Sequence, residues 1–209
     1  ETKDGMRGFA ASVRFEGVRF KHIFLDEPLT GASGRVTVKG GAISFESISG
    51  EFSGGSVKEA SGEIKDLSAS QSYRIALNAS FDAGKTHHLI KGFIERYNPK
   101  ETPLVRFLNA VSISGEAGVI LNISGRRGDE KKMAYKGDLR LKDAGFSYPP
   151  MEINVSSLNG RAAFDNDRLY LNGISAKDAR SSFKVSGSIS GYRTVEPFLN
   201  IAAEGAAAR

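Results

Sequence analysis

Two stretches of this chain repeat one another without a gap. Residues 137–161 align with residues 11–35, and Gly160 stands 126 positions after Gly34. The apolar positions stay in step in this register: Val13 with Leu139, Phe15 with Leu141, Val38 with Phe164, Ile43 with Leu169, and Phe45 with Leu171. An internal repeat indicates a stacked or extended architecture rather than one wrapped core. We therefore expect repeated structural sets, the second of which is cut short of a longer array near Arg209.

Alternation of apolar and polar residues with a period of two dominates the chain. In residues 72–82 one set of side chains is Tyr, Ile, Leu, Ala and Phe, and the other set is mostly polar. This pattern is typical of a strand with one apolar and one polar face. Short glycine-rich turns separate such runs, which favours antiparallel neighbours. The sequence predicts a mainly β fold: an elongated, strongly curved antiparallel sheet that forms a groove and is built from repeated strand sets.

One segment departs from the strand pattern. Thr102 can cap a helix, Pro103 suits its first turn, and the apolar residues that follow have helical spacing. We predict one short helix over 103–110. This divides the chain into a first β-repeat unit over 1–98, a helix and linker over 99–115, and a second, truncated β-repeat unit over 116–209.

Composition argues against several classes of function. The formal net charge is +5 with both signs interspersed, so no nucleic-acid partner is expected. Cysteine is absent, and the three histidines cannot readily share one metal because His87 and His88 are adjacent. No nucleophile, zinc or phosphate-loop motif occurs. We expect a non-enzyme without metal or cofactor.

An apolar sheet face must be covered by a second layer, by closure of the sheet, or by an apolar ligand. Stacked strand sets favour a long apolar trough that binds acyl chains, although a dry sandwich core is the alternative reading of the same residues. The side chains expected to contact lipid are Val13, Phe15, Val36, Val38, Phe45, Tyr73, Ile75, Leu77, Phe81, Val119, Leu121, Ile123, Leu139, Leu141, Phe164, Leu169, Leu171, Phe183, Val185 and Ile189.

The second copy also resembles a known repeat. Its four strand-like pieces are Gly137–Ala144, Val155–Phe164, Leu169–Ala176 and Phe183–Ile189, and Gly34, Phe45 and Gly62 occupy matching places in the first copy. This succession of glycine and apolar spacings is similar to the repeats of the AsmA-like family, the group that includes TamB and YhdP. The likeness covers most of the chain and consists of spacing without a diagnostic signature.

The resemblance implies a bacterial envelope protein, located in the periplasm and anchored in the inner membrane by parts outside these residues. It implies that a β-groove conducts phospholipid between the inner and outer membranes, and it supplies no catalytic residues. Two alternatives stay open. One is a structural or adhesive β-sandwich repeat domain, and the other is a factor that assists assembly of outer-membrane proteins through exposed strand edges.

Overall fold

The computed structural model describes residues 9–21, 28–67, 71–88, 91, 109–177, 181–191 and 198–207. These residues form eleven strands: β1 (Ala10–Phe20), β2 (Leu29–Lys39), β3 (Ala42–Phe52), β4 (Gly55–Lys65), β5 (Ser72–Asp82), β6 (Ser112–Arg126), β7 (Asp129–Tyr148), β8 (Ile153–Asp165), β9 (Arg168–Lys177), β10 (Ser181–Ser190) and β11 (Phe198–Ala207). A 3-10 helix, η1 (Pro149–Met151), connects β7 to β8, where the proline pair predicts an interruption.

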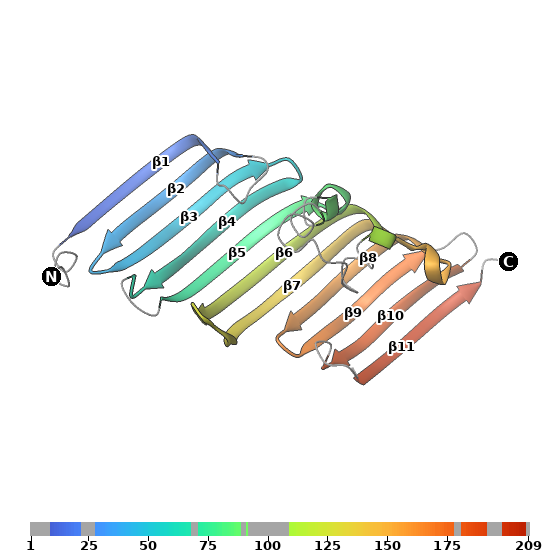
Figure 1. The fold of residues 1–209 in the computed structure, drawn as a ribbon. Coiled ribbons are helices and arrows are strands. Elements are labelled where there is room, and N and C mark those ends of the chain that lie inside the picture. Colours follow the sequence, from blue (N-terminus) through green and yellow to red (C-terminus); the bar gives the residue numbers. More distant parts are fainter. Residues whose placement is uncertain are drawn as a thin grey trace. The chain divides into compact units, whose positions relative to one another are not determined.

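The strands form a single antiparallel sheet whose strand order is the order of the sequence (Figure 1). Each strand pairs with the next along the chain, and β1 and β11 are the two edge strands, so the sheet does not close. The prediction of a mainly β fold with a curved antiparallel sheet is confirmed. Tight connections at Gly40-Gly41, 53–54, 127–128 and 166–167 join successive strands, and the first three contain glycine, as the prediction of glycine-rich turns requires.

The sequence repeat is also a structural repeat. Strands β3, β4 and β5 begin at residues 42, 55 and 72, and β9, β10 and β11 begin at 168, 181 and 198, each 126 positions later. The registers agree as well. In the β2–β3 ladder Thr30 pairs with Glu51, Ser33 with Ser49 and Arg35 with Glu46; in the β8–β9 ladder Ser156 pairs with Lys177, Asn159 with Ser175 and Arg161 with Asn172. The β2–β3 and β8–β9 ladders of the two copies therefore have the same register.

Equivalent β-bulges interrupt the ladders of both copies. Both ladders shift register between the same pairs of positions. Backbone φ is positive at matching places: Gly17 and Asp143, Gly31 and Ser157, Gly34 and Gly160, and Ser47 and Gly173. A bulge bends its strand and increases the local twist. The repeated bulges thus account for the curvature of the strands.

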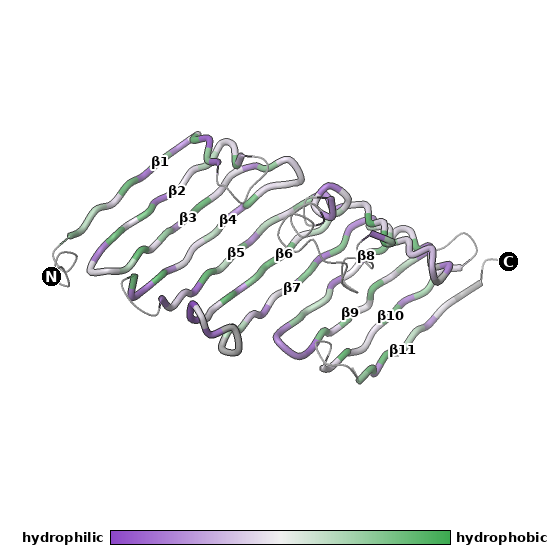
Figure 2. Tube along the Cα trace, viewed as in Figure 1, coloured by the Kyte–Doolittle hydropathy of each residue, from purple (hydrophilic) through white to green (hydrophobic). Residues whose placement is uncertain are grey.

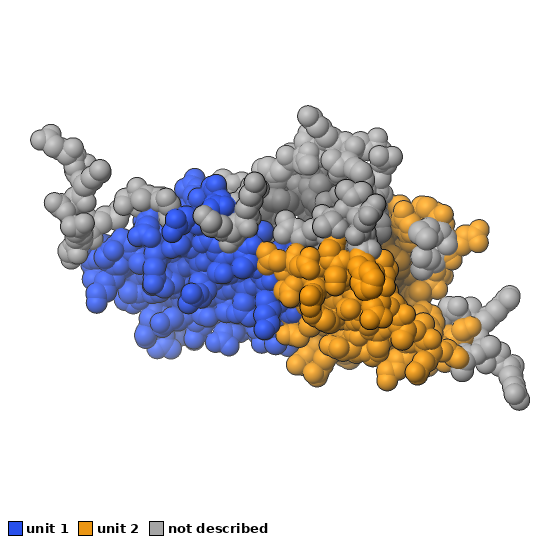
Figure 3. Space-filling view, turned by 90° about the horizontal axis from the view of Figure 1, so that it is seen from below, with its two compact units in different colours: residues 1–52, 56–79, 119–137 blue, residues 53–55, 80–118, 138–209 orange. Residues whose placement is uncertain are grey.

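The chain divides into two compact units (Figure 3). Unit 1 contains residues 1–52, 56–79 and 119–137, and unit 2 contains residues 53–55, 80–118 and 138–209. The boundary crosses β5, β6 and β7 and separates Gly55 from the rest of β4, so these four strands contribute to both units. This division by contacts differs from the division by repeat copies, which follows the sequence.

Helical backbone is scarce among the described residues. Asn109 and Ala110, at the end of the predicted helix, are helical, whereas 103–108 lie outside the described residues. A second helical stretch covers 83–88, where the Asp-Ala-Gly-Lys sequence predicts a turn. It follows β5 directly, and Asp82 begins it by accepting a hydrogen bond from the Lys85 backbone N–H at 2.8 Å.

Small residues make up most of the buried interior of the described part. Its buried apolar residues are Ala32, Ala79, Ala83, Val111, Ala117, Ala144, Ala162, Ile174 and Ala176, and none of the described large side chains is fully buried. In a two-layer domain large apolar side chains normally fill the interior. The larger apolar side chains of this sheet instead keep part of their surface accessible.

Candidate lipid-binding face

The apolar face of unit 1 is assembled by cross-strand pairing. Val36 of β2 lies between Val13 of β1 and Phe45 of β3. The next residues along these strands, Arg14 and Arg35, pair with one another on the opposite face. Figure 2 shows the resulting alternation of hydropathy along the strands. The face thus arises because apolar residues of neighbouring strands are in register.

A glycine lets an aromatic ring lie close to the backbone on this face. A Cβ placed on Gly62 of β4 would come 2.6 Å from Cζ of Phe45 and 2.5 Å from the Arg74 carbonyl oxygen. Glycine is therefore required there if the Phe45 ring is to keep its position. The Tyr73 ring likewise lies close to the backbone of Gly125, where an added Cβ would come 2.8 Å from Tyr73 Cζ.

Unit 2 carries the equivalent apolar row. Leu171 of β9 pairs with Ala162 of β8 on one side and with Gly187 of β10 on the other. Gly187 in turn pairs with Ile201 of β11. Small and large apolar residues therefore alternate across the strands, with Leu171 and Ile201 flanking a glycine.

All twenty side chains predicted to contact lipid lie on strands, and the two units share them. Unit 1 contains Val13, Phe15, Val36, Val38, Phe45, Tyr73, Ile75, Leu77, Val119, Leu121 and Ile123; unit 2 contains Phe81, Leu139, Leu141, Phe164, Leu169, Leu171, Phe183, Val185 and Ile189. Val13 is 60% exposed, and the other nineteen are half-buried. Lateral neighbours in one sheet cover part of each side chain and leave the rest accessible.

Sequence reasoning missed apolar side chains on the edge strands. On β11, Phe198, Leu199 and Ile201 are 70%, 57% and 43% exposed. The repeat register contains the signal that identifies this strand, because Ile201 stands 126 positions after Ile75. On β1, Val18 and Phe20 are also exposed.

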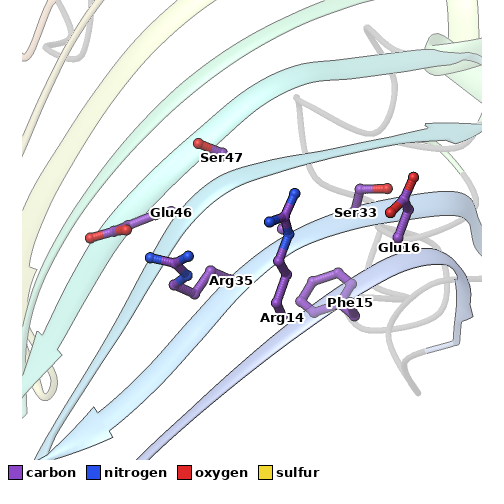
Figure 4. Close-up of a pocket in the computed structure, with 8 residues that line it drawn as sticks. Arg14, Phe15, Glu16, Ser33, Arg35, Glu46 and Ser47 are labelled. Atoms are coloured by element: carbon purple, nitrogen blue, oxygen red, sulfur yellow. The ribbon is translucent and has the colours of Figure 1, made fainter.

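The polar face is hollowed near the bulges of the first copy. A cavity of about 450 Å³ lies in unit 1, and Figure 4 shows its lining side chains. These residues are Arg14, Phe15, Glu16, Ser33, Gly34, Arg35, Glu46 and Ser47. In unit 2 a second cavity, of about 530 Å³, lies beside Asn159, Lys177 and Lys184.

Among the described residues no three His, Cys, Asp or Glu side chains gather as a metal site. His87 is buried, and its ring meets the His88 ring edge-on, with centroids 5.9 Å apart. None of the described helices has the length and apolar character needed to span a membrane. Comparison of the chain with protein-family models, with curated proteins and with solved structures finds no match.

Proposed function

We propose that the apolar face binds the acyl chains of phospholipid and lets them move along the sheet. One observation carries the proposal: the large apolar side chains of this face are half-buried in a single layer of strands. No second sheet covers them among the described strands. An acyl chain is the complementary apolar ligand for such a surface.

The hydrophobic effect provides the affinity. Each buried methylene contributes about 0.8 kcal/mol, so an acyl chain of ordinary length gains on the order of 10 kcal/mol over exposure to water. The rows Val13–Val36–Phe45 and Ala162–Leu171–Gly187–Ile201 present apolar atoms from strand to strand. A chain displaced along either row exchanges one apolar contact for another. Binding of this kind retains lipid without fixing its position, and it requires no catalytic group.

The family resemblance supplies the setting of this proposal. As a segment of an AsmA-like protein, the sheet would act in the periplasm, within a protein anchored in the inner membrane. Its cargo would be phospholipid moving between the inner and outer membranes. The resemblance to the family rests on the spacing of strands and glycines in both copies. The shared bulges and registers add to a different likeness, the one between the two copies.

Lipid extraction tests the proposal directly. Protein purified without detergent and analysed by mass spectrometry should carry phospholipid. Leu121→Asp places a charge on the apolar face of β6, and this variant should lose the lipid while keeping its β-sheet circular dichroism spectrum. Asn122→Asp is the matched control, because it places the same charge on the next residue, which is exposed on the opposite face. Equal lipid content in the two variants would contradict the proposal.

The edge strands favour a second candidate function. Among the described strands, β1 and β11 each have a single neighbour, and both carry exposed apolar side chains, among them Val18 and Phe198. Such edges can accept an extended peptide as an added strand, which would assist the assembly of outer-membrane β-proteins. Hydrogen exchange in the presence of a peptide from an outer-membrane strand should then show new protection confined to β1 and β11. Protection elsewhere or none would exclude this role.

A further inference from the structure

The two copies share few charged residues, and those they share are all basic. Across residues 11–82 and their equivalents 137–208, three charged residues are identical: Arg14 and Arg140, Arg35 and Arg161, and Lys58 and Lys184. No acidic residue is identical between the copies in this range. Asp26 and its equivalent Glu152 are both acidic but differ in residue type. The copies therefore have identical cations at three places and identical carboxylates at none.

The first two shared cations face each other. Arg14 of β1 pairs directly with Arg35 of β2, and both side chains are exposed on the polar face. Residues directly opposite one another on antiparallel strands have Cα atoms about 4.5–5.5 Å apart, and like charges in such positions destabilise a sheet. Within the part of the chain that the structure describes, neither guanidinium forms a hydrogen bond or an ion pair.

A contact close to the first pair recurs in the second copy. The Gly17 backbone N–H donates to Ser33 Oγ at 3.3 Å between β1 and β2. The equivalent Asp143 N–H donates to Asn159 Oδ1 at 3.0 Å between β7 and β8. From this equivalent contact we infer the same register in β7–β8, which places Arg140 opposite Arg161. A repulsive pair kept in both copies indicates a role other than stability.

The acidic neighbours of the pair differ between the copies. In the first copy Glu46 lies opposite Arg35, and Glu16 lies two residues after Arg14. Their equivalents in the second copy are Asn172 and Lys142. Lys142 is paired with Glu116 at 3.0 Å. Asp138, two residues before Arg140, has Ser12 as its equivalent in the first copy. By the same measure the second pair has one acidic neighbour where the first has two.

Figure 4 shows the space that the first pair faces: the guanidinium groups of Arg14 and Arg35 project beside the cavity, and the Ser33 and Ser47 hydroxyls lie at its border. Its volume of about 450 Å³ exceeds that of a phosphate group. Guanidinium groups bind phosphate oxygens through two parallel hydrogen bonds, and hydroxyl groups can donate further ones. Glu16 and Glu46 also line this cavity, and the Arg35 guanidinium is directed toward Glu46. The two guanidinium groups together have enough N–H donors to bind one such anion.

We propose that each arginine pair binds a phosphate group on the polar face, and that Arg140 and Arg161 bind it more tightly than Arg14 and Arg35. Phosphate chemistry is shared by the headgroup of an anionic phospholipid at a membrane surface and by free inorganic phosphate. Arg14 and Arg35 lie on the face opposite Val13 and Val36, although Phe15, one of the predicted lipid contacts, also lines the cavity. Binding of inorganic phosphate involves no acyl chain, so its outcome is independent of the function proposed above.

Two binding measurements on the full chain distinguish the sources. The first is sedimentation with phosphatidylcholine vesicles that also contain phosphatidylglycerol. The second is broadening of the phosphorus NMR line of inorganic phosphate. Arg140→Gln with Arg161→Gln should weaken vesicle binding about 30-fold, since each cation at an anionic surface contributes about a factor of five. The corresponding change at Arg14 and Arg35 should have a smaller effect.

A matched control removes two other charges. Lys39→Gln with Lys177→Gln takes one exposed lysine from each copy and should change binding about twofold or less. The double variant Arg140→Lys with Arg161→Lys keeps both positive charges but removes the planar guanidinium groups. Because lysine cannot form two parallel hydrogen bonds to phosphate, this variant should bind phosphate about tenfold more weakly. Circular dichroism confirms that each variant is folded.

The results of these measurements distinguish a lipid headgroup from free phosphate as the bound anion. Loss of vesicle binding in the arginine variants, but not in the lysine control, supports the proposal and identifies lipid headgroups as the source. Loss of phosphate line broadening alone supports it and identifies free phosphate. Absence of both kinds of binding in the unaltered protein, or an equal loss in the arginine and lysine variants, would overturn it.

Discussion

Gly34 lies against Ile48 within the bulge of the β2–β3 ladder, and Gly160 lies against Ile174 in the same way in β8–β9. A Cβ placed on Gly34 would come 3.1 Å from Ile48 Cα, and one on Gly160 would come 2.8 Å from Ile174 Cα. Backbone φ is +156° at Gly34 and +151° at Gly160. Both positions therefore exclude a side chain on two grounds, close approach of the backbone and the sign of φ.

Gly160→Ala should destabilise the fold by about 2–4 kcal/mol, because alanine requires both a strained φ and a shift of the β9 backbone. Gly205→Ala is the control, since its Cβ would meet Ser182 O at an ordinary 3.4 Å and its φ is not positive. The control should change stability by less than about 1 kcal/mol. Urea denaturation followed by circular dichroism measures both; similar midpoints for the two variants would contradict this account of the bulge.

The repeat explains how much of this fold the sequence could predict. Period-two alternation identified the strands with large apolar residues, and the copy register was correct to the residue. β11 was missed because after Ile201 its sequence is mostly alanine and glycine, so its two faces hardly differ in hydropathy. Comparison with β5 would have found it, since the structural equivalence extends to Phe198–Ala207.

The bulges could not be predicted from either copy alone. Positive φ is adopted by Ser47 in one copy and by Gly173 in the other, and likewise by Gly31 and Ser157. A serine in a strand pattern gives no signal of left-handed backbone, whereas a glycine at the equivalent place does. The polar cavity and the arginine pair were missed for a related reason, because cross-strand register decides which charged residues face each other.

Ser47→Gly should stabilise the fold. Ser47 has φ +51°, in the left-handed region, which costs a non-glycine residue about 1–2 kcal/mol. Glycine removes this strain and loses about 0.5–1 kcal/mol in chain entropy, which leaves a net gain of about 0.5–1 kcal/mol. Ser49→Gly on the same strand is the control and should destabilise, since its φ is not positive. A lower urea midpoint for both variants would show that the strain at Ser47 is not relieved.

The ion pair between Lys142 and Glu116 predicts a small effect that depends on pH. The Lys142 ammonium donates to Glu116 Oε2 at 3.0 Å, and this hydrogen bond, followed by the charge of Glu116, raises the pKa of Lys142 above its ordinary value. A raised pKa in the folded state means that the stabilisation is fully present below the ordinary lysine pKa. It is lost as the pH rises through the raised value.

Lys142→Gln should therefore lower the urea midpoint slightly at neutral pH and low salt, because both side chains are mostly exposed and solvent screens the pair. The difference from the unaltered protein should shrink with added salt and vanish in strong alkali. Lys136→Gln, which replaces an exposed lysine on the same strand, is the control and should lower the urea midpoint less at neutral pH and low salt. A Lys142→Gln effect that persists unchanged in alkali would indicate that lost packing, rather than charge, is responsible.

Acyl-chain binding should stabilise the folded protein, because a ligand that binds only the native state shifts unfolding by mass action. At a free ligand concentration of 100 times Kd the stabilisation is about 2.7 kcal/mol, and for a domain of this size it raises Tm by about 5–10 °C. A short-chain phospholipid below its micelle concentration is a suitable ligand. Leu171→Asp should abolish the Tm increase, because Leu171 occupies the middle of the apolar row in unit 2. Asn172→Asp puts the same charge on the adjacent exposed residue and should leave the increase intact. An equal increase for both variants would mean that the lipid binds elsewhere on the sheet.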